Sequence, residues 1–81
     1  MNTIKDLKPG ERAKVVGYKK GENAYRARLL SMGLTRGTEF AFLKAAPLGD
    51  PVEVELRGFK LSLRKAEAEV LEIEKIVGVE K

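Results

Sequence analysis

The stretch VEVELRGFKLSL, residues 52–63, alternates between apolar and polar side chains on both sides of Arg57-Gly58. Alternation with a period of two is typical of a half-buried β-strand. A two-residue connection that contains glycine is typical of a tight hairpin turn. The stretch therefore predicts two antiparallel strands, 52–56 and 59–63, joined as a β-hairpin.

Further strands are predicted on both sides of this hairpin. EFAFLKAA (39–46) is apolar on both faces, and the loop PLGDP (47–51) connects it to the hairpin. RAKVVGY (12–18) is rich in β-branched residues, but its apolar positions change parity near Gly17, which predicts a β-bulge. VLEIEKIV (70–77) alternates again and predicts the last strand.

Two helical segments and an N-terminal turn complete the prediction. Residues 24–32 predict the main helix, and Gly33 ends it; as a Schellman motif this end would pack Leu34 against Leu29. RKAEAE (64–69) predicts one helical or 3₁₀ turn before the last strand. Near the N-terminus, residues 3–6 suit a single helical turn, and Lys8-Pro9-Gly10-Glu11 suits a type II turn.

Five short strands expose sheet edges that a small protein must cover, and closure into a barrel is the usual solution. We therefore expect a mainly β fold: a small SH3-like barrel of about five antiparallel strands, with one α-helix after the first strand and a short helical turn before the last. Residues 1–81 are expected to form a single domain. An OB-fold is the closest competitor, but it requires a helix where this chain has only Arg57-Gly58.

The composition argues against catalysis and against a bound metal or cofactor. The chain has no Cys and no His, which removes thiolate and imidazole chemistry together with the usual zinc and iron(II) ligands. Two carboxylate pairs, Glu53 with Glu55 and Glu72 with Glu74, project from strand faces, where nothing raises the pKa of one partner as an acid catalyst requires. No glycine-rich phosphate-binding motif is present. We expect no enzyme, no cofactor and no small-molecule substrate, and only an all-oxygen metal site remains open.

The N-terminal residues resemble neither a secretory signal nor a transit peptide, because an acid follows within six residues and no apolar run comes after it. No stretch approaches the roughly 20 apolar residues that a membrane span requires. We therefore expect a cytoplasmic protein without direct membrane insertion.

Positive charge is concentrated in the first part of the chain. Residues 1–44 hold ten Lys and Arg against four Asp and Glu, whereas residues 45–81 hold six against eight. The densest basic group surrounds the predicted helix: Arg26, Arg28, Arg36, Lys19 and Lys20. Such a group can contact phosphates. We favour a solvated or protein-facing patch, because the five aromatic residues, Tyr18, Tyr25, Phe40, Phe42 and Phe59, are expected in the core rather than interleaved with the basic side chains.

Leu48 is an apolar residue within the Pro/Gly/Asp loop. A hydrophobic side chain presented by a rigid loop is a suitable anchor for a partner, but Leu48 could equally fold back over the end of the barrel. The candidate partner-binding residues are Arg26, Arg28, Leu48, Gly49 and Asp50.

Three segments resemble the FeoA family: RxxLLSMGLTRG (Arg26 to Gly37), PLGDP (Pro47 to Pro51) and GFKLSLRKAEA (Gly58 to Ala68). Their order and spacing match along the chain from about Leu7 to Ile76. The resemblance implies an SH3-like accessory protein of ferrous iron uptake, acting in the cytoplasm beside FeoB, a membrane iron(II) transporter with a GTPase domain.

Two alternatives to this function remain. One is a nucleic-acid-binding SH3-like module, suggested by the basic first half of the chain. The other follows from a similarity to the C-terminal regulatory domain of metal-dependent repressors of the DtxR type. No DNA-binding helix-turn-helix precedes the domain here, which argues against a repressor.

Overall fold

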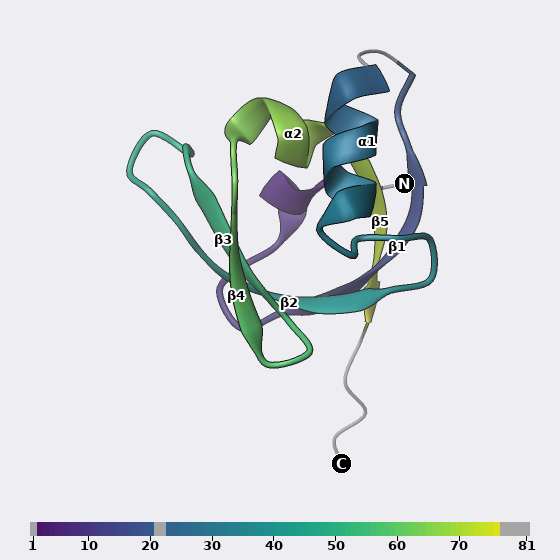
Figure 1. Cartoon of the computed structure of the whole chain (residues 1–81). Helices are drawn as coiled ribbons and strands as arrows, with labels where there is room; N and C mark the ends of the chain where they lie inside the picture. The colour runs from purple at the N-terminus through teal and green to yellow at the C-terminus, as the bar shows by residue number, and fades with distance from the viewer. Residues whose placement is uncertain (1, 21–22, 77–81) are drawn as a thin grey trace.

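The chain is built on one antiparallel sheet, and the computed structural model describes residues 2–20 and 23–76. In this part of the chain, five strands lie in the order β4-β3-β2-β1-β5 (Figure 1). Their bounds are β1 (Arg12–Tyr18), β2 (Glu39–Ala45), β3 (Val52–Leu56), β4 (Phe59–Leu63) and β5 (Leu71–Ile76). The predicted strands are therefore confirmed, apart from small shifts at their ends; residue 77 of the predicted last strand lies outside the described residues.

The predicted hairpin is the regular part of the sheet. β3 and β4 pair without interruption from Val52↔Leu63 to Leu56↔Phe59, and only Arg57-Gly58 lies between them. This short connection leaves no room for the helix of an OB-fold. The OB-fold alternative is therefore excluded.

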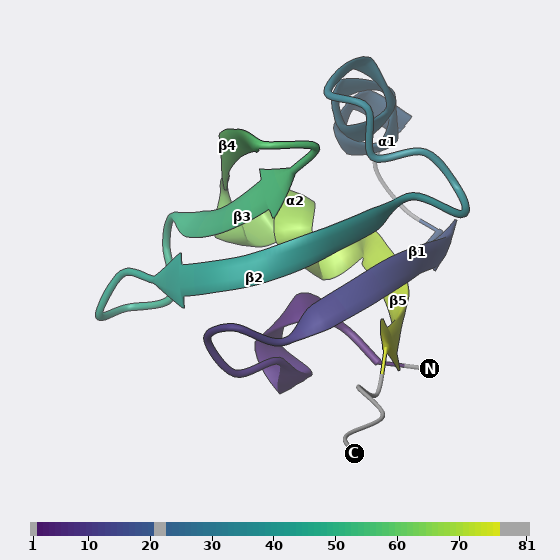
Figure 2. The same cartoon turned by 90° about the horizontal axis from the view of Figure 1, so that it is seen from below.

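The sheet bends at two irregularities. In the pairing of β1 with β5, Val15 lies opposite Ile73 and Gly17 opposite Glu72, which leaves Val16 as the extra residue of the predicted bulge. A second shift, between Phe42 and Lys44, interrupts the pairing of β2 with β3. Bulges increase strand twist and bending. In the bent sheet, β2 runs between the β3–β4 hairpin on one side and β1 with β5 on the other (Figure 2).

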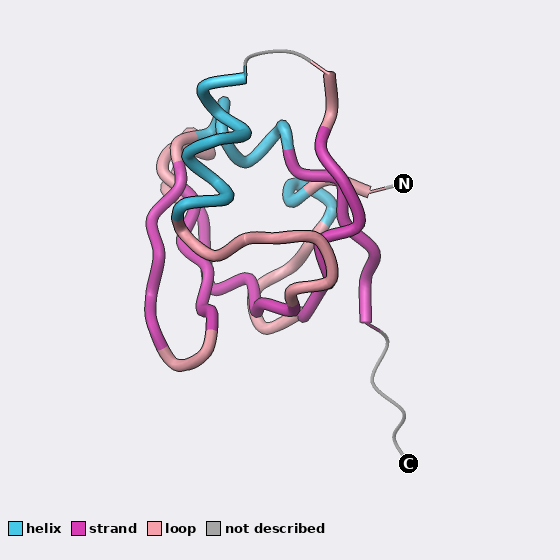
Figure 3. Tube along the Cα trace, turned by 45° about the vertical axis from the view of Figure 1, so that its right-hand side comes forward, coloured by secondary structure: helices cyan, strands magenta, loops and turns pink. Residues whose placement is uncertain are grey.

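The helical segments are η1 (Ile4–Asp6), α1 (Asn23–Ser31) and α2 (Lys65–Val70). α1 ends in the predicted Schellman motif: Gly33 has φ +93°, the Leu34 N–H donates to the Leu29 carbonyl at 3.0 Å, and the Gly33 N–H donates to the Leu30 carbonyl at 3.0 Å. Leu29 and Leu34 are both fully buried. α2 joins β4 to β5 and contacts both α1 and η1 (Figure 3).

The N-terminal segment is fixed against the last strand. Asn2 and Ile73 exchange two backbone hydrogen bonds, of 3.2 and 2.9 Å. The turn that follows η1 forms as predicted, because the Glu11 N–H donates to the Lys8 carbonyl at 3.0 Å and Gly10 has φ +92°. These contacts direct the chain into β1.

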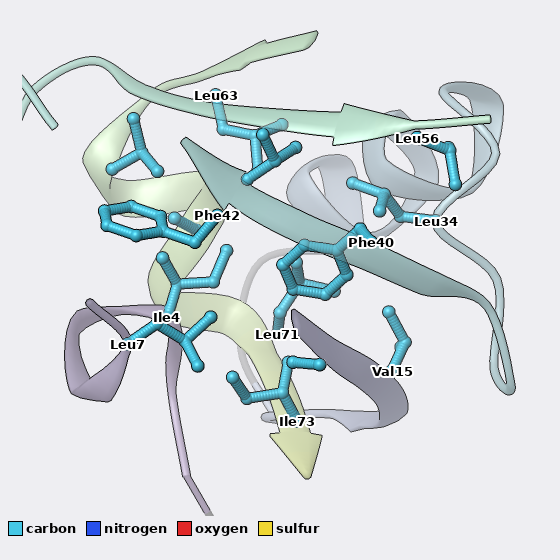
Figure 4. Packing of buried hydrophobic residues seen from close by; sticks show 14 of the residues in the cluster. Ile4, Leu7, Val15, Leu34, Phe40, Phe42, Leu56, Leu63, Leu71 and Ile73 are labelled. Carbon is cyan, nitrogen blue, oxygen red and sulfur yellow. The ribbon is translucent and has the colours of Figure 1, made fainter. Parts of the chain in front are cut away.

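One apolar core fills the space between the curved sheet and the helices. Ile4, Leu7 and Phe42 lie at one end of this core, and Leu34 and Leu56 lie at the other (Figure 4). The side chains with no more than 1% exposure include Val15, Leu29, Leu34, Phe40, Val54, Leu63, Leu71 and Ile73. Burial of each large aliphatic side chain contributes about 1.5–3 kcal/mol, so this cluster is the main source of stability.

The expectation that all five aromatic residues lie in the core is wrong for Phe59, and Tyr18 and Tyr25 are only half-buried. Phe40 and Phe42 are buried, but Phe59 is 72% exposed. β4 is the edge strand of the sheet, and its burial decreases from Leu63, which is buried, through Leu61 to Phe59 beside the turn. Leu56, which pairs with Phe59 from the inner strand β3, is buried, so Phe59 is exposed because it lies on the edge strand beside the turn.

Candidate protein-binding surface

The loop between β2 and β3 holds Leu48 away from the barrel. Two backbone hydrogen bonds close the loop: the Gly49 N–H donates to the Ala46 carbonyl at 2.7 Å, and the Ala46 N–H donates to the Pro51 carbonyl at 3.0 Å. Leu48 is 88% exposed. Of the two arrangements that the sequence left open, the structure has Leu48 projecting into solvent.

Asp50 connects this loop to α2. Its Oδ1 atom accepts a hydrogen bond of 3.1 Å from the backbone N–H of Lys65, the first residue of α2. A carboxylate at a helix N-terminus satisfies a free N–H group and interacts favourably with the helix dipole. The predicted contact residue Asp50 therefore has a structural function, which is to fix the loop that carries Leu48.

Arg28 connects α1 to α2. Its Nε atom lies 2.7 Å from Oε2 of Glu67, whose side chain is 3% exposed, while 58% of the Arg28 side chain is exposed. The other carboxylate oxygen of Glu67, Oε1, accepts a hydrogen bond of 3.1 Å from the Arg64 N–H. Both oxygens of this buried carboxylate are thus satisfied, as a buried charge requires.

Glu67 is not among the residues predicted from the sequence. The available signal was its position, because Glu67 lies three residues after Arg64, the residue that precedes α2. A glutamate at the third helical position commonly accepts a hydrogen bond from the backbone N–H before the helix. Its second partner, Arg28, comes from a distant helix and could not be identified from local spacing.

Arg26 lies over an aromatic ring. Its guanidinium carbon is 5.4 Å from the centre of the Tyr18 ring, a cation–π geometry. The Tyr18 hydroxyl donates a hydrogen bond of 2.6 Å to the Leu34 carbonyl. Burial raises the pKa of the Tyr18 phenol, and the positive charges of Arg26 and Arg36 partly oppose this effect. Arg26 is exposed but has a defined position on the barrel.

The predicted contact residues do not form one cluster. The 46–51 loop and α1 lie apart, with α2 between them, in Figure 1. The loop is bound to α2 through Asp50, and α1 is bound to α2 through Arg28. The structure therefore places Leu48, Gly49 and Asp50 together on one side of α2, and Arg26 and Arg28 on the other.

Carboxylates do not gather into a metal site in the described residues: no group of three or more Asp or Glu side chains has a suitable arrangement within 2–20 and 23–76. None of the helices formed by these residues has the length and apolar character needed to cross a bilayer.

A comparison with protein families gives a match over almost the whole chain. The FeoA domain matches residues 2–75. The chain belongs to the FeoA family. The resemblance deduced from the segments RxxLLSMGLTRG, PLGDP and GFKLSLRKAEA is therefore confirmed.

Among known proteins, this chain is 33% identical over 73 residues to a Fe(2+) transport protein A/Fe(2+) transporter FeoB fusion protein of Porphyromonas gingivalis. This match covers 90% of the chain but only 8% of the fusion protein. Among solved structures, the FeoA protein of Chlorobium tepidum is 40% identical, with a TM-score of 0.83 and coverage of 98% of this chain and 74% of that one.

A third comparison concerns the fold alone. The FeoA of Stenotrophomonas maltophilia, described as a prokaryotic SH3 domain protein and solved with zinc, has a TM-score of 0.76 at 23% identity, and 91% of each chain is covered. The predicted SH3-like fold of this FeoA-family chain is therefore confirmed.

Proposed function

We propose that this FeoA-family chain is a cytoplasmic accessory protein of ferrous iron uptake, and that it acts by binding the cytoplasmic part of a FeoB-type membrane transporter. It catalyses no reaction itself. The observation that carries the proposal is the exposure of Leu48, 88%, on a loop that Asp50 fixes to α2. An apolar side chain on a loop whose backbone is already fixed requires no ordering of that loop on binding, and it is a suitable anchor for a protein interface.

The choice of partner is supported by the fusion protein of Porphyromonas gingivalis, whose name joins transport protein A and the transporter FeoB in one chain. Two proteins that are fused in one organism commonly act together in others. Activity of this chain beside a FeoB-type transporter is therefore the function that we infer for it.

In the proposed complex, Leu48 is the apolar anchor, and Arg26 and Arg28 supply positive charge. Arg28 keeps this capacity although it contacts Glu67, because 58% of its side chain is exposed and a guanidinium group has five N–H donors. Charge pairs at the rim of an interface mainly raise the rate of association.

The test is a titration of the fluorescently labelled full chain with the purified cytoplasmic region of the FeoB-type transporter from the same organism. We expect saturable binding for the wild type, and binding at least about tenfold weaker for Leu48→Asp, as for loss of an interface anchor. Arg26→Glu is expected to lower the association rate.

Phe59→Asp is the matched control, because Phe59 is also an exposed apolar residue but lies at the opposite end of the β3–β4 hairpin from the loop. It should bind like the wild type. No binding by the wild-type chain would overturn the proposed partner. Equal loss in the Leu48→Asp and Phe59→Asp variants would overturn the assignment of the loop.

A further inference from the structure

An apolar cavity of about 220 Å³ lies beside the Leu48 loop. Its wall is formed by buried side chains of η1, the segment after it and the sheet, among them Ile4, Leu7, Phe42 and Val52. The first three of these lie together at one end of the core in Figure 4. Two of the cavity's lining positions, Gly49 in the loop and Ala68 in α2, carry little or no side chain, which leaves space between the loop and the helix.

The cavity can hold one large apolar side chain. A dry apolar cavity of about 150 Å³ is sufficient to bind benzene, so a volume of 220 Å³ accommodates a phenylalanine or leucine side chain. An exposed apolar pocket of this kind is a typical site for an anchor residue from a partner protein.

Of the three charged side chains that line the cavity, two are positive. Lys5 and Lys65, both exposed, contribute to its lining, and in the described part of the chain no carboxylate lies within 4.0 Å of either ammonium group. Glu69, which is half-buried, is the carboxylate of the lining. Lys65 is also the first residue of α2, where a positive charge is unfavourable for the helix dipole. Its exposed ammonium group is available to pair with an acidic ligand.

From this combination we infer that the cavity is the docking site for an acidic segment of a protein partner, which inserts one bulky apolar side chain between Lys5 and Lys65. Carboxylates on either side of the inserted residue pair with the two lysines. Leu48, next to Gly49 of the lining, makes a second apolar contact from the rim. The inference rests on the proposed function only for the identity of the partner, a cytoplasmic segment of the FeoB-type transporter.

The first experiment does not use the transporter. Three synthetic peptides are titrated into the isotopically labelled full chain and followed by NMR: one with a single phenylalanine flanked by glutamates, one with alanine in place of phenylalanine, and one with lysines in place of the glutamates. We expect the acidic phenylalanine peptide to shift the methyl signals of Ile4, Leu7 and Val52. The alanine and lysine peptides should bind at least about tenfold more weakly.

Variants of the protein locate the site. Ala68→Leu fills the cavity from within, and Ala45→Phe covers it from an exposed position of β2. Both should abolish the methyl shifts.

The double variant Lys5→Glu/Lys65→Glu should bind the acidic peptide at least about tenfold more weakly and should favour the lysine peptide. The control Lys19→Glu/Lys60→Glu has the same net charge but changes exposed residues outside the cavity lining, and it should behave as the wild type.

Absence of binding by the acidic phenylalanine peptide, or binding that the cavity variants leave unchanged, overturns the inference. The same variants are then tested with the cytoplasmic region of the transporter. If that region binds the wild type and the cavity variants equally, the docking site is wrong while the proposed function stands. If that region fails to bind while the peptide does, the proposed partner is wrong and the docking site stands.

Discussion

At the scale of single residues, the ion pair of Arg28 and Glu67 is asymmetric, because Glu67 is buried and Arg28 is largely exposed. Arg28→Met leaves a buried carboxylate with one hydrogen bond, which we expect to lower the free energy of unfolding by about 3 kcal/mol. Glu67→Gln leaves an arginine that water can solvate, and it should cost only about 1 kcal/mol.

Urea unfolding of the two single variants and of the double variant measures this difference, and the double variant should be more stable than Arg28→Met alone because it has no unpaired buried charge. A larger cost for Glu67→Gln than for Arg28→Met would contradict the account. Because changes at Arg28 also affect stability, Arg26 is the better residue for testing charge at the interface.

Tyr18 gives a prediction for alkaline pH. Its folded-state pKa is raised by burial, above the value of about 10 for an unfolded chain. The protonated phenol, which donates to the Leu34 carbonyl, therefore contributes stability that is present below pH 10 and is lost as pH rises through the folded-state pKa. Phenolate absorbance is measured in the Tyr25→Phe variant, in which Tyr18 is the remaining tyrosine. It should rise only at pH values above about 10, the pKa of tyrosine in an unfolded chain.

The stability of the chain, measured by urea unfolding across the same alkaline range, gives a second readout. Tyr18→Phe should remove the part of the alkaline destabilisation that belongs to this phenol, whereas Tyr25→Phe should retain it. An unchanged pH dependence in Tyr18→Phe would show that other groups cause the destabilisation.

At the scale of elements, the end of α1 depends on Gly33. A residue with a side chain pays about 1 kcal/mol or more for positive φ, and a Cβ at this position would lie 3.3 Å from Cδ2 of Leu56, a buried core residue. We expect Gly33→Ala to lower the free energy of unfolding by about 2 kcal/mol. Thermal or urea unfolding measures the loss.

Gly10→Ala is the matched control. Gly10 has a similar φ of +92°, but a Cβ there would meet nothing within 4 Å. The Gly10→Ala variant should therefore lose only about 1 kcal/mol of unfolding free energy, the effect of the positive φ alone. Equal losses for Gly10→Ala and Gly33→Ala would mean that Leu56 moves aside without cost.

The elements themselves were predictable because their signals are local. Alternation in 52–63 and the Gly33 stop depend on neighbouring residues, and each appears in the structure where the sequence places it. The exposure of Phe59 and the burial of Glu67 depend on where the core ends and on a contact between α1 and α2. Such properties arise from the packing of distant segments, which single-sequence periodicity does not contain.

At the scale of the whole molecule, ion pairs between the two halves of the chain offset part of the charge asymmetry. Pairing of β1 with β5 brings Lys14 to within 4.0 Å of Glu74, and the helices bring Arg28 to Glu67. Positive side chains of the first half thus lie against carboxylates of the second. Folding thereby weakens the main argument for a nucleic-acid-binding module.

We therefore expect no retardation of duplex DNA or RNA by the protein in a gel-shift experiment at low ionic strength. Nucleic-acid binders show affinity that falls steeply as salt rises, because bound cations are released from the phosphates. A complex at low salt that dissociates with such a slope would restore the nucleic-acid alternative. A basic protein of known DNA affinity serves as the positive control.

The contact between Asn2 and Ile73 has a consequence for larger assemblies. It holds the beginning of the domain against its last strand, on the side of the molecule opposite the 46–51 loop in Figure 1. A linker attached near Asn2 therefore leaves Leu48 uncovered. When such a domain is tethered to its partner, as in a fusion protein, a short flexible linker supplies an effective concentration in the millimolar range. A surface that binds only weakly in solution would then be occupied most of the time.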